Sequence, residues 1–374
     1  MTLTKPPAIG TRRVPGFDVV LAVLALAVAC FGVLMVYSAT RDPLRAAGEN
    51  PHYYVERQLL FVVLGALVML VVSRIDYRRF EQLATPAYVL SILALLAVRS
   101  PLGSNAQGAQ RWFSFGPIQV QPSEFTVLAM ILAVATYCER RPDGLSMRDV
   151  VRMLVMAGVP ILLVYLQPDL GTAIIMVVVL IVMLLIAGVP TRFLFLLTVL
   201  GAGIGAIAIV LGVLQHYQIL RLTSFIGTPL YQVTQAKAAI GSGGMWGKGF
   251  FHGIFINGGY VPESQTDFIF TAVGEQLGFF GALGLILALA GVAGRMLRAS
   301  MLARDHLGRL LAVGVFTFFA FSCFQNVGMI MGIMPVTGIP LPFMSYGGSA
   351  AVCFFLAVGI VLSVTNRRGQ KVAA

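Results

Sequence analysis

The sequence consists mostly of apolar stretches of roughly 20 residues, separated by short polar segments. A stretch of that length crosses about 30 Å of hydrocarbon as a helix, whereas the strands of a membrane barrel would be half as long and alternating. The composition agrees, because 58% of the residues are hydrophobic and only 11% are charged. We therefore expect an all-α polytopic membrane protein and exclude a soluble globule, a disordered chain and a fibrous one.

The apolar stretches predict ten transmembrane helices. Their approximate bounds are residues 17–39, 58–73, 83–98, 124–139, 151–167, 172–188, 193–214, 268–293, 310–330 and 348–365. The first stretch follows a basic amino end but is too long for a cleaved signal peptide, so we interpret it as the first span. The whole chain, residues 1–374, is then a single integral membrane domain.

The basic residues between the spans predict the orientation. With the amino end inside, the inner segments carry 18 of the 26 Lys and Arg residues and the outer segments carry 8. The positive-inside rule then places both tails, residues 1–16 and 366–374, in the cytoplasm. The same rule accounts for the net charge of +11. No stretch interleaves basic and aromatic residues as a nucleic-acid groove does, so we expect no nucleic-acid partner.

Two predicted outer loops are long, residues 99–123 between spans 3 and 4 and residues 215–267 between spans 7 and 8. Loops of this size in a compact membrane protein usually carry function. In the second loop, the Gly-rich segment 241–249 is flexible enough to lay its backbone N–H groups against an anion, with Lys248 supplying charge. A plain flexible loop is the alternative interpretation.

Ionisable residues within or at the edge of spans are functional hypotheses by default. Glu124 opens the fourth span, where helix capping and a functional role stay equally open. Asp169 lies in a tight turn and is predicted to form the turn and cap the next helix. Asp267 follows Glu263 at the outer mouth of the eighth span, where two converging acids favour chemistry over capping. Glu275 lies about 12 Å deeper in the same helix and is expected to pair with a basic or amide side chain.

Four polar segments fall on the outer side when the spans are oriented by their flanking Lys and Arg residues. That orientation was inferred without considering these segments. They are residues 121–124, 167–172, 262–267 and 338–349. The last is non-helical around Ser345 and Tyr346, which is tolerable only against protein or a wet cavity. We therefore predict one extracytoplasmic site. Because the sequence has no nucleotide-binding signature, its substrate must be already activated, and a lipid-linked diphosphate sugar supplies its own leaving group.

The same segments carry a family resemblance. The strings are Arg-Trp-Phe at 111–113, Gln-Pro-Ser-Glu at 121–124, Gln-Pro-Asp-Leu-Gly-Thr-Ala at 167–173, Ala-Ile-Gly-Ser-Gly-Gly at 239–244, Thr-Asp-Phe at 266–268 and Gly-Ile-Pro-Leu-Pro-Phe-Met-Ser-Tyr-Gly-Gly-Ser at 338–349. Over nearly the whole chain they closely resemble the SEDS family (shape, elongation, division and sporulation). The stretch 338–343 is more similar to RodA, the elongation member, than to FtsW, the division member.

The resemblance implies a ten-span peptidoglycan glycosyltransferase that polymerises lipid II, a polyprenyl-diphosphate disaccharide peptide, during cell elongation. It implies a multi-pass protein of the bacterial cytoplasmic membrane with its active site facing outside, paired with a class B penicillin-binding protein that acts as the transpeptidase. By the motif, Asp267 is similar to the essential aspartate of the family. A lipid II flippase and a scaffold for the penicillin-binding protein are the alternative functions.

For the reaction, we expect an inverting displacement with Asp267 as the general base. A retaining route requires a second carboxylate about 5 Å away as nucleophile, and Glu263 is the neighbouring candidate. The departing diphosphate requires positive charge or N–H groups. The predicted substrate-binding residues are Glu124, Arg111, Lys248, Glu263, Ser345 and Tyr346, with Asp169 and Glu275 in supporting roles.

Two positions depart from the family pattern. The family usually has a Lys three residues after the Glu of Gln-Pro-Ser-Glu, where this chain has Val127, and a His before Thr-Asp, where it has Gln265. The missing Lys removes a cation expected beside Glu124 or the substrate diphosphate. The candidate replacements are Arg111, Arg221, Lys237 and Lys248. A divalent cation, Mg or Mn, is the alternative, and no other cofactor is predicted.

Overall fold

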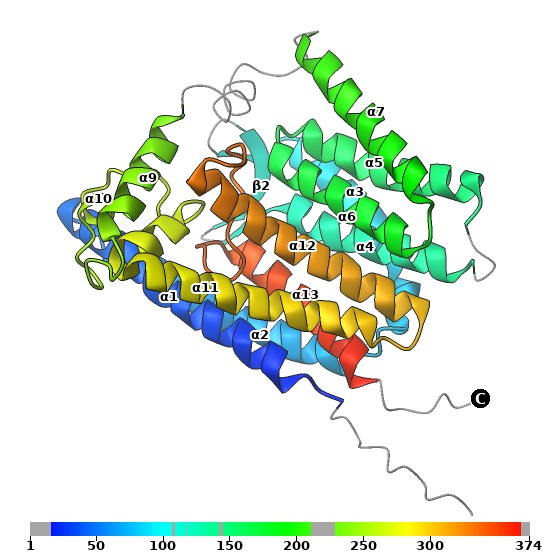
Figure 1. The fold of residues 1–374 in the computed structure, drawn as a ribbon, viewed down its shortest axis with the longest axis horizontal. Helices are drawn as coiled ribbons and strands as arrows, with labels where there is room; N and C mark the ends of the chain where they lie inside the picture. The colour runs from blue at the N-terminus through cyan, green and yellow to red at the C-terminus, as the bar shows by residue number, and fades with distance from the viewer. Residues whose placement is uncertain (1–15, 107–108, 117, 142–144, 211–228, 368–374) are drawn as a thin grey trace, which may run out of the picture.

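The computed structural model describes residues 16–106, 109–116, 118–141, 145–210 and 229–367. Within this part of the chain, ten helices of 17 residues or more form a bundle (Figure 1). They are α1 (Val19–Ala46), α2 (Tyr53–Arg74), α3 (Arg79–Val98), α4 (Pro122–Glu139), α5 (Met147–Tyr165), α6 (Leu170–Ile186), α7 (Thr191–Val210), α11 (Ile269–Met301), α12 (His306–Met331) and α13 (Gly348–Asn366). Most of the two predicted cytoplasmic tails, and Arg221 with residues 215–228 of the second long loop, lie outside the described residues.

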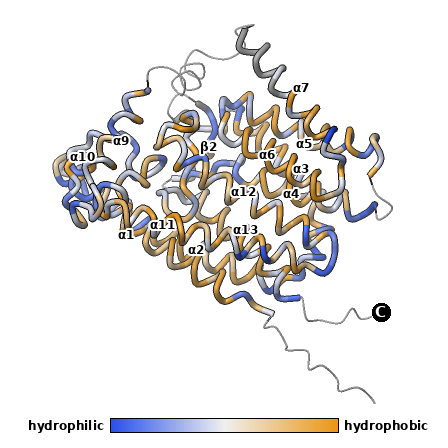
Figure 2. Tube along the Cα trace, in the orientation of Figure 1, coloured by the Kyte–Doolittle hydropathy of each residue, from blue (hydrophilic) through white to orange (hydrophobic). Residues whose placement is uncertain are grey.

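Six of these helices are long and apolar enough to cross a membrane: α1, α2, α3, α11, α12 and α13. Helix α6 is apolar but shorter. Hydrophobic residues run along the helices and hydrophilic residues gather at their ends and connections (Figure 2). Helices α12 and α13 lie at the centre, since 67% and 83% of their most apolar windows are buried. A helical membrane protein is therefore what the fold supports, and the count of ten spans remains a prediction.

Each predicted span overlaps one of the ten helices, but several helices are longer than expected. Helices α2, α3 and α4 have 22, 20 and 18 residues, and α11 continues to Met301 over 33 residues. The physical reason is that the apolar run marks only the part that crosses hydrocarbon. Beyond it, a helix continues into the polar headgroup region, where residues such as Arg74 and Arg298 place their charges.

The prediction that the fold is all-α is wrong in the first long loop. Strands β1 (Ser104–Ala106), β2 (Ala109–Phe115) and β3 (Ile118–Val120) form an antiparallel sheet in the order β1-β2-β3. Aromatic residues in β2 suit a strand, and Gly116 supplies the positive φ of 62° that the tight connection between β2 and β3 requires. A short sheet thus connects α3 to α4.

The second long loop also contains helices. These are α9 (Tyr231–Gly243) and the single turn α10 (Ile254–Asn257), which lie beside the broken end of α11 (Figure 1). Contacts join α9 to both α11 and α12. The loop is therefore a structured part of the bundle.

Helix α11 is interrupted at Gly278, whose φ of 66° and ψ of −161° are not helical. The interruption removes two helical hydrogen bonds, which is costly at membrane depth unless other groups replace them. Four backbone hydrogen bonds replace them, from the N–H groups of Lys248 and Gly249 to the carbonyls of Glu275 and Gln276, and from the N–H groups of Phe279 and Phe280 to the carbonyls of Gly244 and Met245. The Gly-rich segment 243–249 is thus bound to the broken helix along its backbone.

The two ends of the described bundle meet at one place. A Cβ atom on Gly16 would lie 2.8 Å from the carbonyl oxygen of Asn366, and the Asn366 amide donates to the carbonyl of Ser73 at 2.8 Å. Residues 16 and 366 therefore lie at the same end of the bundle. Which membrane face this end occupies remains a prediction.

Candidate functional site

The structure brings the last polar segment, 338–349, against the segment that contains Asp267. The Tyr346 N–H donates to the carbonyl of Gln265 at 2.8 Å. The Ser345 hydroxyl donates to the carbonyl of Thr266 at 2.6 Å and accepts the N–H of Leu341 at 2.8 Å. Ser345 is therefore engaged with backbone on both sides and holds the two segments together.

The other two polar segments, 121–124 and 167–172, meet at the same end of the bundle. The Gln121 amide and the Ser123 hydroxyl both donate to Oδ2 of Asp169 at 2.9 Å. Oδ1 of Asp169 accepts the N–H of Thr172 at 3.3 Å and so caps α6. The Gln121 N–H donates to the Ser349 hydroxyl at 3.0 Å, which joins this pair to the start of α13. All four segments thus form one polar assembly.

Asp267 lies just before α11, with its side chain partly exposed. Its main chain is held by Asn326, a fully buried residue of α12. The Asn326 amide donates to the carbonyls of both Asp267 and Ile339, each at 2.8 Å. Since Ser345 holds the preceding carbonyl, the backbone that carries the Asp267 carboxylate is fixed on both sides. A carboxylate on fixed backbone is pre-positioned for chemistry.

Two non-glycine residues with left-handed backbone lie in the facing segments: Glu263, with φ of 53°, and Phe343, with φ of 65°. Such residues cost on the order of 1–3 kcal/mol each and gather at functional sites. The Oε2 atom of Glu263 accepts the Thr266 hydroxyl at 3.0 Å. The Phe268 N–H also donates to the carbonyl of Glu263 at 3.2 Å, so Glu263 and Asp267 lie within one tight turn.

A cation near this assembly was missed by the sequence analysis. Arg57, near the start of α2, places its guanidinium carbon 3.7 Å from the centre of the Tyr53 ring and lies beside Tyr346. The Tyr346 ring packs edge-on against Tyr54 at 4.8 Å. Burial raises the pKa of Tyr346, so its phenol stays an O–H donor at neutral pH. Among the described residues, no ion pair involves Arg57.

The neighbouring Gln58 was also missed. Its amide donates to the carbonyl of Ser345 at 3.1 Å and accepts the N–H of Gly347 at 3.3 Å. Gln58 is fully buried, so these bonds satisfy both ends of an amide inside the bundle. The available signal was a cation followed by an amide at the edge of an apolar run, to which the sequence analysis assigned no role.

Lys248 forms an ion pair with Glu275, whereas the sequence analysis predicted that Lys248 binds the substrate. The two side chains approach to 3.3 Å, and Glu275 is fully buried. The carboxylate of Glu275 also accepts the N–H groups of Phe255 and Ile256 at 2.9 and 3.0 Å. Glu275 therefore anchors α10 to α11, and its charge offsets that of Lys248.

The Gly-rich segment does not offer its N–H groups to an anion. The N–H groups of Lys248 and Gly249 bind the broken helix α11, and that of Gly247 donates to the carbonyl of Gly243 at 2.8 Å. The anion-binding interpretation is therefore wrong for these groups. The glycines are needed because a side chain at Gly247 would collide with the carbonyl of Gln276.

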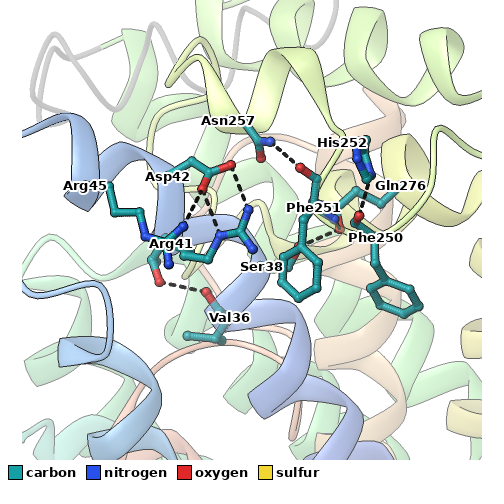
Figure 3. Close-up of polar contacts among 11 residues, drawn as sticks. Val36, Ser38, Arg41, Asp42, Arg45, Phe250, Phe251, His252, Asn257 and Gln276 are labelled. Carbon is teal, nitrogen blue, oxygen red and sulfur yellow. Dashed lines mark hydrogen bonds and ion pairs between the residues drawn. The ribbon is translucent and has the colours of Figure 1, made fainter.

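The other side of the same break contacts α1, as Figure 3 shows. The Ser38 hydroxyl of α1 donates to the Gln276 side chain at 2.6 Å, and the same oxygen accepts the N–H of Phe251 at 3.3 Å. The Asn257 amide donates to the carbonyl of Phe251 at 2.6 Å. The break is thus embedded in polar contacts from both α1 and the loop.

Arg111, in β2, lies against the turn that precedes Asp169. Its Nε donates to the carbonyl of Gln167 at 2.8 Å, and its guanidinium also bonds the carbonyl of Pro168. A charged donor on two carbonyls stabilises the turn. The structure therefore gives Arg111 a positioning contact with the 167–172 segment.

Glu124 is buried at 8% exposure, beside Ser349 and Asp169. Its Oε2 has no hydrogen-bond partner among the described residues. Val127 is fully buried, so the position where the family carries Lys faces packed side chains here. Arg111 and Lys248 are engaged elsewhere, Arg221 lies outside the described residues, and Lys237 lies beside Gly332 at the end of α12.

Within the described residues, the side chains present do not make a metal site. In the described part of the chain, no three His, Cys, Asp or Glu side chains gather as metal ligands. We therefore derive no step through Mg or Mn.

Comparison with known proteins gives the family. Residues 18–370 match the family model described as "Cell cycle protein", which covers FtsW, RodA and SpoVE. The chain is 35% identical over 375 residues to a probable peptidoglycan glycosyltransferase FtsW of Trichlorobacter lovleyi, covering 96% of each chain. It is 34% identical over 358 residues to the peptidoglycan glycosyltransferase MrdB of Escherichia coli K12, covering 94% of each.

A solved structure agrees with these relatives. One chain of a peptidoglycan synthase complex, described as coordinating polymerization and crosslinking, matches with a TM-score of 0.80 and 28% identity. The match covers 95% of this chain and 99% of that one. Since the sequence motifs, the fold and the family model agree over nearly the full length, the chain belongs to the SEDS family of FtsW, RodA and SpoVE.

Proposed function

We propose that the chain is a peptidoglycan glycosyltransferase that polymerises lipid II at the outer face of the bacterial cytoplasmic membrane. The names of the relatives at 34% and 35% identity support the reaction class. The structural observation that carries the proposal is the fixed backbone at Thr266 and Asp267, held by Ser345 and Asn326 where four distant segments meet.

In the proposed reaction, the Asp267 carboxylate accepts the proton of an acceptor sugar hydroxyl. The oxygen of that hydroxyl forms a bond to the anomeric carbon of the donor, and the bond from that carbon to the diphosphate oxygen breaks. The electron pair leaves with the polyprenyl diphosphate, and the configuration inverts. One carboxylate is enough for this route, whereas the retaining alternative uses Glu263 as nucleophile.

We assign the leaving diphosphate to Arg57 and Tyr346. Arg57 is a cation that no described carboxylate neutralises, and it lies beside the Tyr346 phenol next to the 265–267 backbone. Positive charge and O–H donors placed before the reaction stabilise the developing anion. The other predicted residues fit positioning roles, because their polar groups already contact protein: Arg111, Lys248 and Ser345.

The test is polymerisation of purified lipid II by the detergent-solubilised chain, alone and with its class B penicillin-binding partner. Wild type should give glycan ladders, and Asp267→Asn should lower the rate by about 100-fold to 10,000-fold, the range for loss of a general base. Glu49→Gln is the matched control, since Glu49 is an exposed acid in the connection between α1 and α2. Its rate should equal that of wild type.

The same assay separates the alternative functions. Ladders from Asp267→Asn at the wild-type rate would remove Asp267 from the chemistry. Wild type that makes no ladder but moves lipid II across a vesicle membrane would favour a flippase. Wild type that makes no ladder and moves no lipid II, yet binds the penicillin-binding protein, would favour a scaffold.

Two finer points belong to the proposal. The partner is a class B penicillin-binding protein, which the similarity to a chain of a polymerising and crosslinking complex supports.

For the cellular process, the stretch 338–343 alone favours elongation, whereas the FtsW name of the relative at 35% identity favours division. Depletion in the source bacterium distinguishes them, because loss of division leaves filaments and loss of elongation leaves rounded cells.

A further inference from the structure

We propose that a cavity at the end of the bundle opposite Asp267 binds the phosphate headgroup of an anionic membrane phospholipid. The cavity has a volume of about 660 Å³ and lies where α2 ends, α3 begins and α13 ends. Its lining residues are Val71, Arg74, Ile75, Asp76, Arg78, Arg79, Gln82 and Arg367. Arg57 lies near the start of α2 and Arg74 is its last residue, so most of the length of α2 separates this cavity from the candidate active site.

The lining carries an excess of positive charge. It contains four arginines and one acid. Arg367 pairs with Asp76 at 3.0 Å, and Arg78 pairs with Asp305 at 3.5 Å. Arg74 and Arg79 enter none of the ion pairs among the described residues. Two guanidinium groups are therefore left for an anionic ligand, and planar guanidinium groups match phosphate geometry.

The start of α3 adds to the positive field. Arg78 is the N-cap of this 20-residue helix, Arg79 is its first residue and Gln82 follows one turn later. The amino end of a helix carries partial positive charge, so the cavity receives the favourable end of the α3 dipole. The Gln82 amide supplies a neutral donor at the same rim.

An apolar stripe leads directly into the cavity. Leu60, Val63, Leu67 and Val71 follow one another at helical spacing on α2 and are 51–61% exposed. Val71 also lines the cavity. A ligand that places a phosphate among the arginines can lay a hydrocarbon chain along this stripe. A free phosphate would use only the charged half, which is why we assign the site to a lipid.

The predicted orientation agrees with this ligand. The positive-inside rule places this end on the cytoplasmic side, where the leaflet is anionic. Basic pockets between transmembrane helices on that side are suited to phospholipid headgroups.

The experiment is native mass spectrometry of the purified full-length chain titrated with phosphatidylglycerol or phosphatidylcholine. The test variant is Arg74→Gln with Arg79→Gln, which removes the two unpaired cavity arginines. The control is Arg298→Gln with Arg309→Gln, which removes the same charge from exposed positions outside the cavity. Soluble glycerol phosphate is the competitor that separates a headgroup site from a free phosphate site.

We expect wild type and control to retain phosphatidylglycerol over phosphatidylcholine, and the cavity variant to bind it on the order of tenfold more weakly. Equal retention of the two lipids, or equal weakening in the control, would overturn the proposal. Displacement by glycerol phosphate at the concentration of the lipid would assign the site to a soluble phosphate instead. If the double variant fails to fold, the single Arg79→Gln variant carries the same test. The readout does not use catalysis, so its failure leaves the proposed function unaffected.

Discussion

At the residue scale, Asn326 shows how the site is held. One buried amide satisfies two carbonyls, those of Asp267 and Ile339, from segments on either side of α12. Neither carbonyl belongs to a regular helix, and the same amide donates to both. The proposed base is thus fixed by a residue that does not itself take part in the chemistry.

We predict that Asn326→Leu destabilises the protein and lowers polymerisation. The substitution removes the shared donor from both carbonyls, at about 1–3 kcal/mol each, so the free energy of unfolding should fall by on the order of 2–6 kcal/mol. Thermal unfolding in detergent and the lipid II assay measure the two effects. Ser322→Ala is the control on the same helix, since among the described residues its buried hydroxyl bonds the carbonyl of Phe318 within α12 and no other group. An Asn326→Leu protein as stable and active as the control would contradict the role.

The residues found from sequence and those missed differ in a physical way. Three of the predicted residues are acids at the edges of apolar runs: Asp267, Asp169 and Glu124. Because an ionisable side chain in or near hydrocarbon costs free energy, each is a functional candidate even when its partner is unknown. Asn326 and Gln58 are polar residues whose value depends on partners 59 and 287 residues away. One sequence does not reveal such pairings. For the same reason, sequence assigned Lys248 to the substrate, although Glu275 offsets its charge.

At the scale of the element, the interruption of α11 at Gly278 joins this helix to the loop residues 244–249, and we call this region the joint. Four backbone hydrogen bonds replace two helical ones, and all of them require the chain to pass very close to Gly278. A side chain at Gly278 would meet the backbone of Gly247 and Met245, and its left-handed φ of 66° is strained for any other residue.

We predict that Gly278→Ala destabilises the joint by more than the roughly 1–3 kcal/mol of backbone strain, because a steric collision adds to that strain. Gly284→Ala, in the same helix, has open space around its Cβ and ordinary helical backbone. It should be neutral or slightly stabilising. Hydrogen exchange of residues 244–249 is the measurement, and unchanged protection in Gly278→Ala would show that the joint tolerates a side chain.

Sequence predicted helices in all ten places because hydropathy reports contact with lipid. It did not predict the three short strands or the break, since both depend on contacts outside any apolar run. Gly278 is one of 40 glycines in the sequence. It can be recognised as the site of the helix break only from the backbone hydrogen bonds between residues 244–249 and α11.

At the scale of the whole molecule, the four polar segments meet at one end and the basic cavity lies at the other. The first and last described residues lie at the cavity end, since Gly16 lies beside Asn366 and Arg367 lines the cavity. The two ends of the bundle therefore differ in the polar groups that they carry.

We predict that the end carrying Asp267 faces outward. In a variant lacking Cys30, Cys138, Cys323 and Cys353, a Glu49→Cys substitution should react with a membrane-impermeant maleimide in spheroplasts. A Met301→Cys substitution, at the opposite end and 66% exposed, should react only after lysis. Both should react in detergent, which controls for access. The reverse pattern would invert the orientation and place both termini outside.

Some of the hydrogen bonds that complete the bundle join residues made early in synthesis to residues made near its end. Gln58 on α2 finds its partner in Ser345, 287 residues later, and the carbonyl of Ile75 accepts the Ser363 hydroxyl, 288 residues later. Because synthesis proceeds from the amino end, the Gln58 amide lacks these partners until residues 345–347 have been made. A chain that stops before residue 345 lacks the contacts that Ser345 and Tyr346 make with the backbone of Gln265 and Thr266. We therefore expect a chain that ends before these residues to be inactive as a polymerase, because the backbone beside Asp267 loses two of the hydrogen bonds that hold it.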